Sequence, residues 1–274
     1  MINIDTLLRH SMKPNKDTDL QQALASFSPI HLQDMANVSL LNRIDTKYMM
    51  PLSELPQILA QLQTQYRILD IDGTRLNQYH TVYFDESGFT FYNQHHNQYG
   101  TRYKVRARQY VDTELMFFEV KHKSNRKRTI KSRLPLDSAR DLNPAQINAF
   151  VDLYVPVDST RLEPKLWNDY RRLTLVGKTR PERVTIDLDL AFGWHDDFAE
   201  LPGIAIAEVK QEKFSQDSAF IQQMRRMGIR STSFSKYCSG VYLLYEEVKR
   251  NNFKPVMRQV SKLVEQEGLH GSAQ

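Results

Sequence analysis

Alternating cations in the middle of the chain restrict its fold most. Between residues 102 and 108 every second side chain is basic, at Arg102, Lys104, Arg106 and Arg108. A β-strand has a side-chain period of two, so these charges share one face of a predicted strand. The alternation returns at Phe117, Glu119, Lys121 and Lys123, and again at Lys131 and Arg133. We therefore predict three successive strands with charge on one face and apolar side chains on the other.

The charged face has two explanations. An ordinary antiparallel sheet turns its polar face to solvent. Here the charges are nearly all cationic, with Glu119 alone among them, and like charges opposite one another on neighbouring strands repel. An anion or a metal–anion complex on this face would relieve the repulsion. We therefore interpret the face as a binding surface for a polyphosphate-like anion.

The same alternation occurs in other parts of the chain. It places Arg43, Asp45 and Lys47 together, then Arg183, Asp187 and Asp189, then Glu208, Lys210 and Glu212. A sheet with one continuous charged face can lie open in water or close around a lumen. Closure explains why the opposite faces are apolar and why helices separate the strands. We predict an α+β fold, an antiparallel β-barrel of about eight strands with a charged lumen and flanking helices.

The predicted organisation is one large domain with two extensions. Residues 1–30 read as an N-terminal helical extension, residues 31–247 as the barrel domain and residues 248–274 as a polar C-terminal tail. A helix predicted from Ser235 carries Lys236 in its first turn, where the helix dipole favours anions. An anionic group near that helix terminus would resolve the conflict.

Composition limits the class of protein. The net charge of +5 is modest, so the basic character is local. Cys238 is the one cysteine, and no run of 18 uncharged apolar residues occurs. We expect a cytoplasmic protein without a membrane span. The basic cluster between Lys121 and Arg133 also suits nucleic acid, but aromatic residues alternate with its cations only sparsely and no recognised motif is present, so we expect no nucleic-acid partner.

Nine short motifs carry a family resemblance. They are R-x-D-x-K-Y at 43–48, T-V-Y-F-D at 81–85, K-V-R-A-R at 104–108, F-E-V-K-x-K at 118–123, K-x-R at 131–133, Y-R-R at 170–172, R-V-T-I-D at 183–187, A-E-V-K at 207–210 and S-K-Y at 235–237. In this order, from about residue 30 to 245, the chain resembles the VTC (vacuolar transporter chaperone) domain. That domain is the polyphosphate polymerase branch of the CYTH-like triphosphate tunnel metalloenzymes.

The resemblance implies a function and a set of residues. It implies an enzyme that transfers the terminal phosphoryl group of ATP to inorganic polyphosphate inside a basic tunnel, with Mn²⁺ or Mg²⁺. The implied catalytic residues are Lys47, Arg106, Arg108, Lys121 and Arg172. The implied phosphate-binding residues are Arg43, Lys104, Lys131, Arg133, Arg183, Lys210 and Lys236. Glu208 would hold the metal, with Glu119 and Asp187 either as further metal ligands or as partners that orient the cations.

Several alternatives stay open at this stage. Asp45 replaces the glutamate of the commoner R-x-E-x-K motif, which shortens the carboxylate by one methylene. With water as acceptor, the same residues would make a tripolyphosphatase or nucleoside triphosphatase. A non-catalytic polyphosphate-binding module is the third alternative. The sequence leaves open the choice between Mn²⁺ and Mg²⁺, the oligomeric state, the exit of the product and a membrane-protein partner.

Overall fold

A computed structural model describes residues 18–38, 44–125, 129–136 and 144–271 of the 274-residue chain. Arg43, one of the predicted phosphate-binding residues, lies outside these ranges. Of residues 269–271 only the backbone is described.

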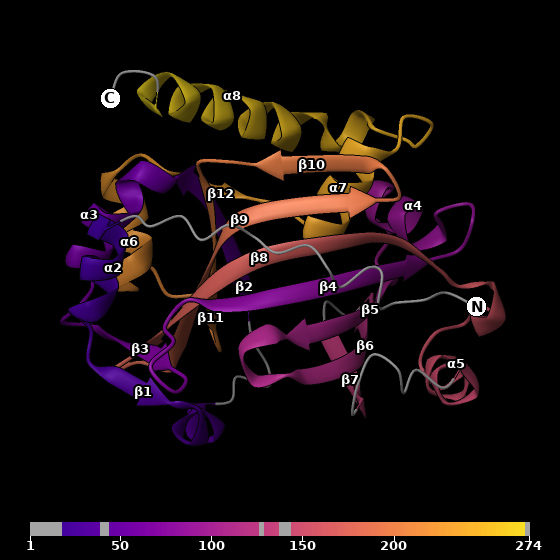
Figure 1. Ribbon diagram of the computed structural model, residues 1–274, viewed down its shortest axis with the longest axis horizontal. Helices are drawn as coiled ribbons and strands as arrows, with labels where there is room; N and C mark the ends of the chain where they lie inside the picture. Colours follow the sequence, from indigo (N-terminus) through magenta and orange to yellow (C-terminus); the bar gives the residue numbers. More distant parts are fainter. Residues whose placement is uncertain (1–17, 39–43, 126–128, 137–143, 272–274) are drawn as a thin grey trace.

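One sheet of twelve strands forms the centre of the described structure (Figure 1). Its main ladder has the order β12-β2-β11-β9-β8-β4-β5-β6-β7, with β1, β3 and β10 attached beside it. The described strand pairs are antiparallel, except β1 with β3. The strands are β1 (Pro29–His31), β2 (Ile44–Pro51), β3 (Tyr66–Asp70), β4 (Asn77–Asp85), β5 (Arg102–Tyr110), β6 (Leu115–Lys123), β7 (Thr129–Leu136), β8 (Glu163–Gly177), β9 (Glu182–Trp194), β10 (Asp197–Leu201), β11 (Ile204–Gln211) and β12 (Ser231–Thr232).

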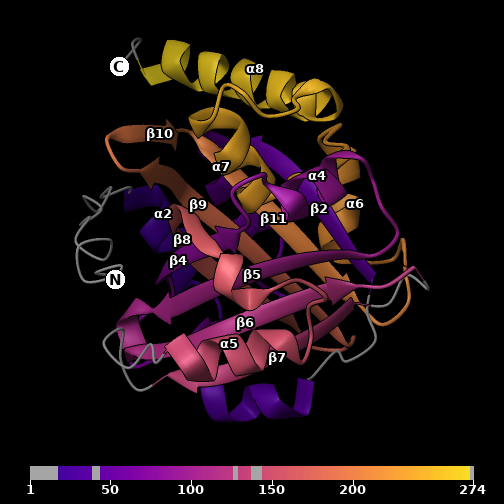
Figure 2. The ribbon, with the colours of Figure 1, turned by 90° about the vertical axis from the view of Figure 1, so that its right-hand side faces the viewer.

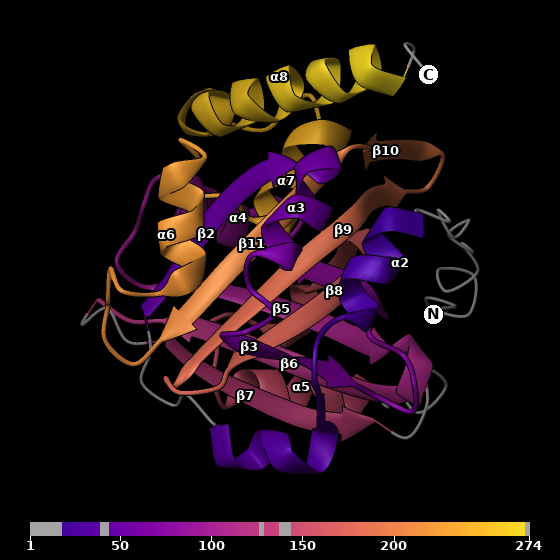
Figure 3. The same ribbon diagram turned by 90° about the vertical axis from the view of Figure 1, so that its left-hand side faces the viewer.

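Helices cover the sheet on several sides. The α-helices are α2 (Thr18–Ala25), α3 (Leu55–Ala60), α4 (Thr90–His96), α5 (Pro144–Asp152), α6 (Ala219–Arg226), α7 (Lys236–Leu244) and α8 (Lys254–Gly271). Short 3₁₀ helices are η1 (Leu32–Val38), η2 (Leu52–Glu54), η3 (Val111–Thr113), η5 (Ser159–Arg161) and η6 (Asn251–Phe253). Figure 3 shows α2, α3 and α6 over β8, β9, β11 and β2, whereas Figure 2 shows α4, α5 and α7 on the other side.

The apolar strand faces form two cores. Behind β8, β9 and β11, residues such as Leu173, Ile186 and Val209 pack with α2, α3 and α6. Behind β5 and β6, residues such as Val105 and Phe118 pack in a second core that includes residues of α4, α5 and α7. The alternation seen in the sequence therefore buries one face of each strand and leaves the other for the interior cavity.

The charged faces of both ends of the ladder meet around one space. Residues of β2, next to one end of the ladder, and of β7, at the other end, line the same cavity. In the described part of the chain no ladder pairs β7 with β12. The predicted antiparallel sheet with a charged inner face and flanking helices is thus confirmed, but hydrogen bonds do not close it. The short strands β1, β10 and β12 raise the strand number above the predicted eight, because so few residues show no clear alternation.

Helix α7 fills the inner side of the sheet beside the cavity. Tyr237 and Val241 are buried in the same core as Phe192 and Ile204, which lie on β9 and β11. Gly240 permits this approach, because a Cβ atom there would lie 2.8 Å from Phe192 Cδ1. The polar cavity therefore occupies only part of the inner face.

The segment predicted as a polar C-terminal tail contains a long helix. Residues 254–271 form α8, with Val256, Met257 and Val260 buried against the second core. These apolar residues recur at helical spacing among many polar ones, so the stripe is narrow. Of the helices in the described ranges, none is both long enough and apolar enough to cross a membrane.

We expect Asp85→Ala to lower the free energy of unfolding by about 3 kcal/mol or more, because it leaves several buried donors unpaired. The Asp85 carboxylate is fully buried and accepts hydrogen bonds from the backbone N–H groups of Glu86, Phe91 and Tyr92 and from the Tyr237 hydroxyl. Denaturant unfolding measures the change. The control is Asp112→Ala, which removes an exposed side chain whose carboxylate accepts from Gln78 N. Equal losses in the two variants would contradict this role.

Candidate functional site

A cavity of about 1010 Å³ lies inside the curved sheet, and the predicted site residues surround it. The predicted residues that line it are Lys47, Lys104, Arg106, Arg108, Lys121, Lys131, Arg133, Arg172, Arg183, Asp187, Glu208, Lys210 and Lys236. Glu119 lies behind this lining, with a side chain that is only 1% exposed. The structure thus brings together residues from seven strands and α7 that are up to 189 positions apart along the chain.

Glu119 holds three cations from neighbouring strands. Its carboxylate lies 2.6 Å from Arg106 Nη2 and 3.1 Å from Arg133 Nε, and it also pairs with Lys131. Burial opposes its ionisation, but the charges of Arg106, Arg108 and Lys131 lower the pKa of Glu119 well below its usual range. Burial and the charge of Arg106 lower the pKa of Lys131 to about 6. One carboxylate therefore does not neutralise all the cations around it.

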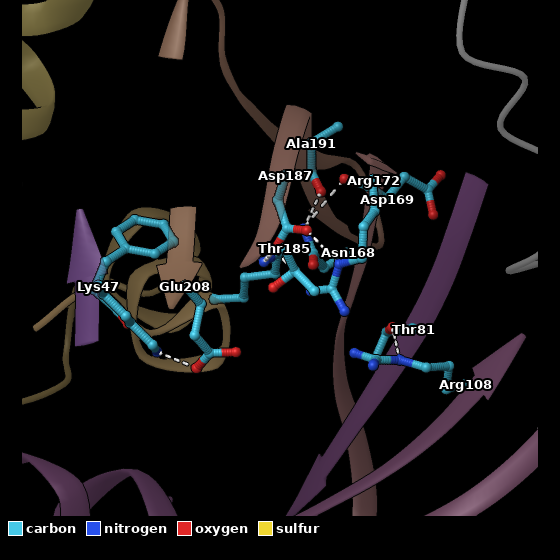
Figure 4. Close-up of polar contacts among 12 residues, drawn as sticks. Lys47, Thr81, Arg108, Asn168, Asp169, Arg172, Thr185, Asp187, Ala191 and Glu208 are labelled. Atoms are coloured by element: carbon cyan, nitrogen blue, oxygen red, sulfur yellow. Dashed lines mark hydrogen bonds and ion pairs between the residues drawn. The ribbon is translucent and has the colours of Figure 1, made fainter. Parts of the chain in front are cut away.

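Asp187 is the centre of a second cluster (Figure 4). Its Oδ1 lies 2.5 Å from Arg172 Nε, its Oδ2 lies 2.9 Å from Arg172 Nη2, and it also pairs with Lys236. Although burial opposes ionisation, Arg172 and Lys236 lower the pKa of Asp187 below its usual range. Lys236 lies in the first turn of α7, so the Asp187 carboxylate supplies the anionic group that this helix terminus was predicted to need.

Glu208 lies in a third cluster, opposite Lys47 in the pairing of β11 with β2. Its Oε2 is 2.7 Å from Lys210 Nζ, and its Oε1 is 3.9 Å from Lys47 Nζ. Lys47 also donates a 2.6 Å hydrogen bond to the backbone oxygen of Phe234, just before α7. Despite burial, the neighbouring lysine charges lower the pKa of Glu208 well below its usual range.

An aromatic pair supports the arginines of the cavity. The rings of Tyr79 and Tyr170 stack with centroids 5.1 Å apart. The guanidinium groups of Arg108 and Arg172 lie 5.0 to 5.8 Å from these ring centroids, and Lys236 Nζ lies 4.3 Å from that of Tyr170. Such contacts favour cations over the faces of aromatic rings. The sequence patterns did not predict this pair, because the strand that carries Tyr79 shows no alternating charges.

Lysines that face the cavity are crowded. Burial lowers the pKa of Lys104 to about 7 and that of Lys121 to about 8. Lys104 Nζ donates a 2.7 Å hydrogen bond to Ser235 Oγ, and Ser235 also caps α7 by accepting from Cys238 N. Bound anions would favour the charged forms of these lysines. The electrostatics of the cavity therefore suit a ligand with several negative charges.

The carboxylates of the cavity fit a metal ion that takes its remaining ligands from a bound phosphate group and from water. The described residues contain no group of three or more His, Cys, Asp or Glu side chains placed to hold a metal ion alone. Glu208 and Asp45 lie on the same faces of adjacent strands, where Asp45 is exposed and pairs in register with Lys210. Mg²⁺ in phosphate-binding sites usually takes one or two carboxylates and completes its shell with phosphate oxygens and water. Glu208 and Asp45 match that donor set.

Comparisons with solved structures give distant likenesses. A candidate adenylate cyclase from Bacillus halodurans has 14% identity and a TM-score of 0.47, with 71% of this chain and 94% of that chain covered. A candidate adenylyl cyclase from Hippeastrum, described as having a dominant triphosphatase activity, has 12% identity and a TM-score of 0.47, with 72% and 94% covered. A protein from Pyrococcus horikoshii has 8% identity and a TM-score of 0.41, with 72% and 95% covered.

A comparison with curated proteins gives no match. The family model of the VTC domain matches residues 42–245, a range that contains β2 to β12 and all of α7. This range also holds every described residue of the three carboxylate clusters. The chain therefore belongs to the VTC domain family.

Proposed function

We propose that this protein is a polyphosphate polymerase that transfers the terminal phosphoryl group of ATP to a growing polyphosphate chain. The observation that carries the proposal is the excess of positive charge in the cavity. Eleven lysine and arginine side chains line it against four carboxylates, those of Asp45, Asp187, Glu208 and Glu212. This excess suits two polyanions at once, a nucleotide donor and a polyphosphate acceptor.

The shape of the cavity supports a linear ligand. Along β6, lining residues extend from Leu115 to Lys121, which corresponds to about 20 Å of strand. Cations follow the same direction on β5, at Lys104, Arg106 and Arg108. An extended phosphate chain could therefore contact successive cations along the cavity.

The chemistry needs alignment and charge neutralisation. An ionised terminal oxygen of the acceptor attacks the γ-phosphorus of ATP; the new O–P bond forms as the bond to the β-phosphate oxygen breaks, and ADP leaves with that electron pair. Arg106, Arg108 and Arg172 would hold the transferring group in line and neutralise its charge. The carboxylates of Glu119 and Asp187 fix the first and the last of these guanidinium groups before the substrate binds.

Lysines would bind the remaining phosphates. Lys47, Lys104, Lys121, Lys131 and Lys236 would contact phosphates beside the reacting centre, and Arg133, Arg183 and Lys210, which also line the cavity, would add further contacts. Glu208 and Asp45 would hold Mn²⁺ or Mg²⁺, which would add positive charge at the phosphate oxygens. We propose that Glu119 and Asp187 orient cations rather than bind metal, because each is enclosed by its ion-pair partners.

A triphosphatase is the second candidate. The Arg133 side chain is 47% exposed and that of Lys47 is 30% exposed, so solvent reaches the lining. Water could then replace the acceptor chain while the same cations hold the triphosphate. This activity would release orthophosphate without making polymer.

The first test follows polymer length on a gel during incubation with ATP, Mn²⁺ and a short polyphosphate primer. We expect a lengthening polymer with matching ADP, and no product in excess EDTA. Arg172→Ala should lower the rate by about 10²- to 10³-fold, because it removes a guanidinium aimed at the transferring group. Orthophosphate without polymer would contradict the polymerase and support the triphosphatase.

Arg171→Ala is the matched control for this test. Arg171 pairs with Asp189 at 2.5 Å, as Arg172 pairs with Asp187, but it is not part of the cavity lining. It should keep most of the wild-type rate. An equal loss in both variants would contradict the proposed role of Arg172, because breaking either arginine–aspartate pair between β8 and β9 would then have the same effect.

A second prediction concerns pH. In the free protein Lys131 and Lys104 have pKa values of about 6 and 7, so both are largely neutral at pH 8. A bound polyanion favours their charged forms, so binding takes up protons at pH 8, and affinity falls as pH rises from 6 to 8, by up to about tenfold per pH unit for each lysine. Below about pH 5 both are already charged and the uptake vanishes.

Calorimetry with long-chain polyphosphate, in two buffers of different ionisation enthalpy, measures this uptake. Lys131→Met should reduce the number of protons taken up at pH 8. The control Lys178→Met changes a lysine outside the cavity and should leave it unchanged. Binding without proton uptake at pH 8 would contradict the predicted lysine titration.

A further inference from the structure

One end of the cavity is aromatic and apolar. On the inner faces of β5 and β6 the cations give way to Tyr110, Phe117 and Leu115 towards the turn that joins the two strands. Leu115 is 48% exposed although it is apolar. The cationic wall described above therefore ends in a surface of a different chemistry.

A chain of aromatic rings joins this end to the arginine cluster. The Tyr79 ring, which stacks on Tyr170 beneath Arg108 and Arg172, lies 4.9 Å from the Tyr110 ring. The Tyr110 ring in turn lies 5.9 Å from that of Phe117, at an interplanar angle of 84°. Phe117 also pairs with Arg108 in the strand register. The apolar end is therefore directly continuous with the cations that would bind phosphates.

Two turns meet at this end of the cavity. The carboxylate of Asp112, in η3, accepts a 2.6 Å hydrogen bond from the backbone N–H of Gln78 at the start of β4. The turn that precedes β4 contains Ile71, which also lines the cavity, as does Leu32 at the start of η1. Apolar side chains from two parts of the sheet thus contribute to one mouth.

We propose that this mouth binds the nucleobase of the triphosphate donor, an inference that rests on the proposed function. A nucleoside triphosphate is charged at one end and flat and apolar at the other, as this cavity is. From Arg106 to Tyr110 the strand rises about 14 Å, which separates the two chemistries along one wall. Arg133, with its guanidinium carbon 5.3 Å from the Phe117 ring centroid, can cover the base or contact the phosphates.

The base would bind by stacking rather than by hydrogen-bonded readout. Among the described residues of β5, β6 and η3 that line this mouth, Tyr110 and Thr113 alone carry hydroxyl groups. Stacking on aromatic rings tolerates every base, because each base has an apolar face. The donor specificity should therefore be broad among purine triphosphates. The γ-phosphate would then point towards Arg106, and the acceptor chain would approach from the end at Thr129 and Asp45.

The test compares the binding of ATP, GTP and inorganic tripolyphosphate to the full-length protein by calorimetry. Wild type should bind ATP and GTP with similar affinity. Phe117→Ala should weaken both nucleotides by about 5- to 100-fold, the range typical of one stacked base, and leave tripolyphosphate within about twofold. Phe117→Trp should restore nucleotide binding. Tyr99→Ala, at a ring that is 55% exposed outside the cavity, is the matched control and should change nothing.

The outcomes separate this inference from the proposed function. Equal losses for ATP and tripolyphosphate in Phe117→Ala would overturn the inference, since Phe117 would then only position Arg133. Unchanged ATP binding would overturn it as well. If wild type makes no polymer but Phe117→Ala loses nucleotide affinity alone, the base site stands and the polymerase fails. If wild type makes polymer and the variant binds ATP normally, the polymerase stands without this site.

Discussion

The structure depends on buried carboxylates that hold cations towards a common interior. Glu119, Asp187 and Glu208 each form ion pairs with two or three basic side chains from different strands or from α7. Without them, the inner faces of β5, β6 and β7 would place like charges opposite one another. The carboxylates reduce this repulsion without cancelling it. Burial, together with the neighbouring cations, lowers the pKa values of Lys104, Lys121 and Lys131, and a polyanionic substrate would favour their charged forms.

Burial of the apolar outer faces offsets the free-energy cost of placing so many charges in the interior. Two cores, one behind β8, β9 and β11 and one behind β5 and β6, bury the residues that alternate with the charges. Helix α7 belongs to the second core through Tyr237 and Val241, while Lys236 and the preceding Ser235 reach the cavity. The hydrogen bond from Tyr237 to Asp85 anchors the first turn of that helix. The start of α7 therefore contributes both to the apolar core and to the lining of the cavity.

Sequence patterns predicted most of the wall of the cavity. A strict period of two assigned Arg106, Lys121 and Glu208 to inner faces, because only one face of each strand could be apolar. The same pattern could not show that no ladder joins β7 to β12 in the described part of the chain, because alternation identifies the face of a strand and not its neighbours. It missed the Tyr79–Tyr170 stack, because the strand that carries Tyr79 shows no alternating charges and a pattern within one strand does not identify a partner on another. It also missed α8, whose buried stripe of Val256, Met257 and Val260 is narrow within a polar segment.

The central claim is that the paired cations form one continuous site for a phosphate chain. A crystal structure of the protein with inorganic tripolyphosphate tests it most directly. We expect successive phosphates inside the cavity, in contact with Arg106, Arg108 and Arg172, with the Arg106–Glu119 and Arg172–Asp187 pairs retained. Phosphates bound only to outer surfaces, with the cavity side chains unchanged, would contradict it.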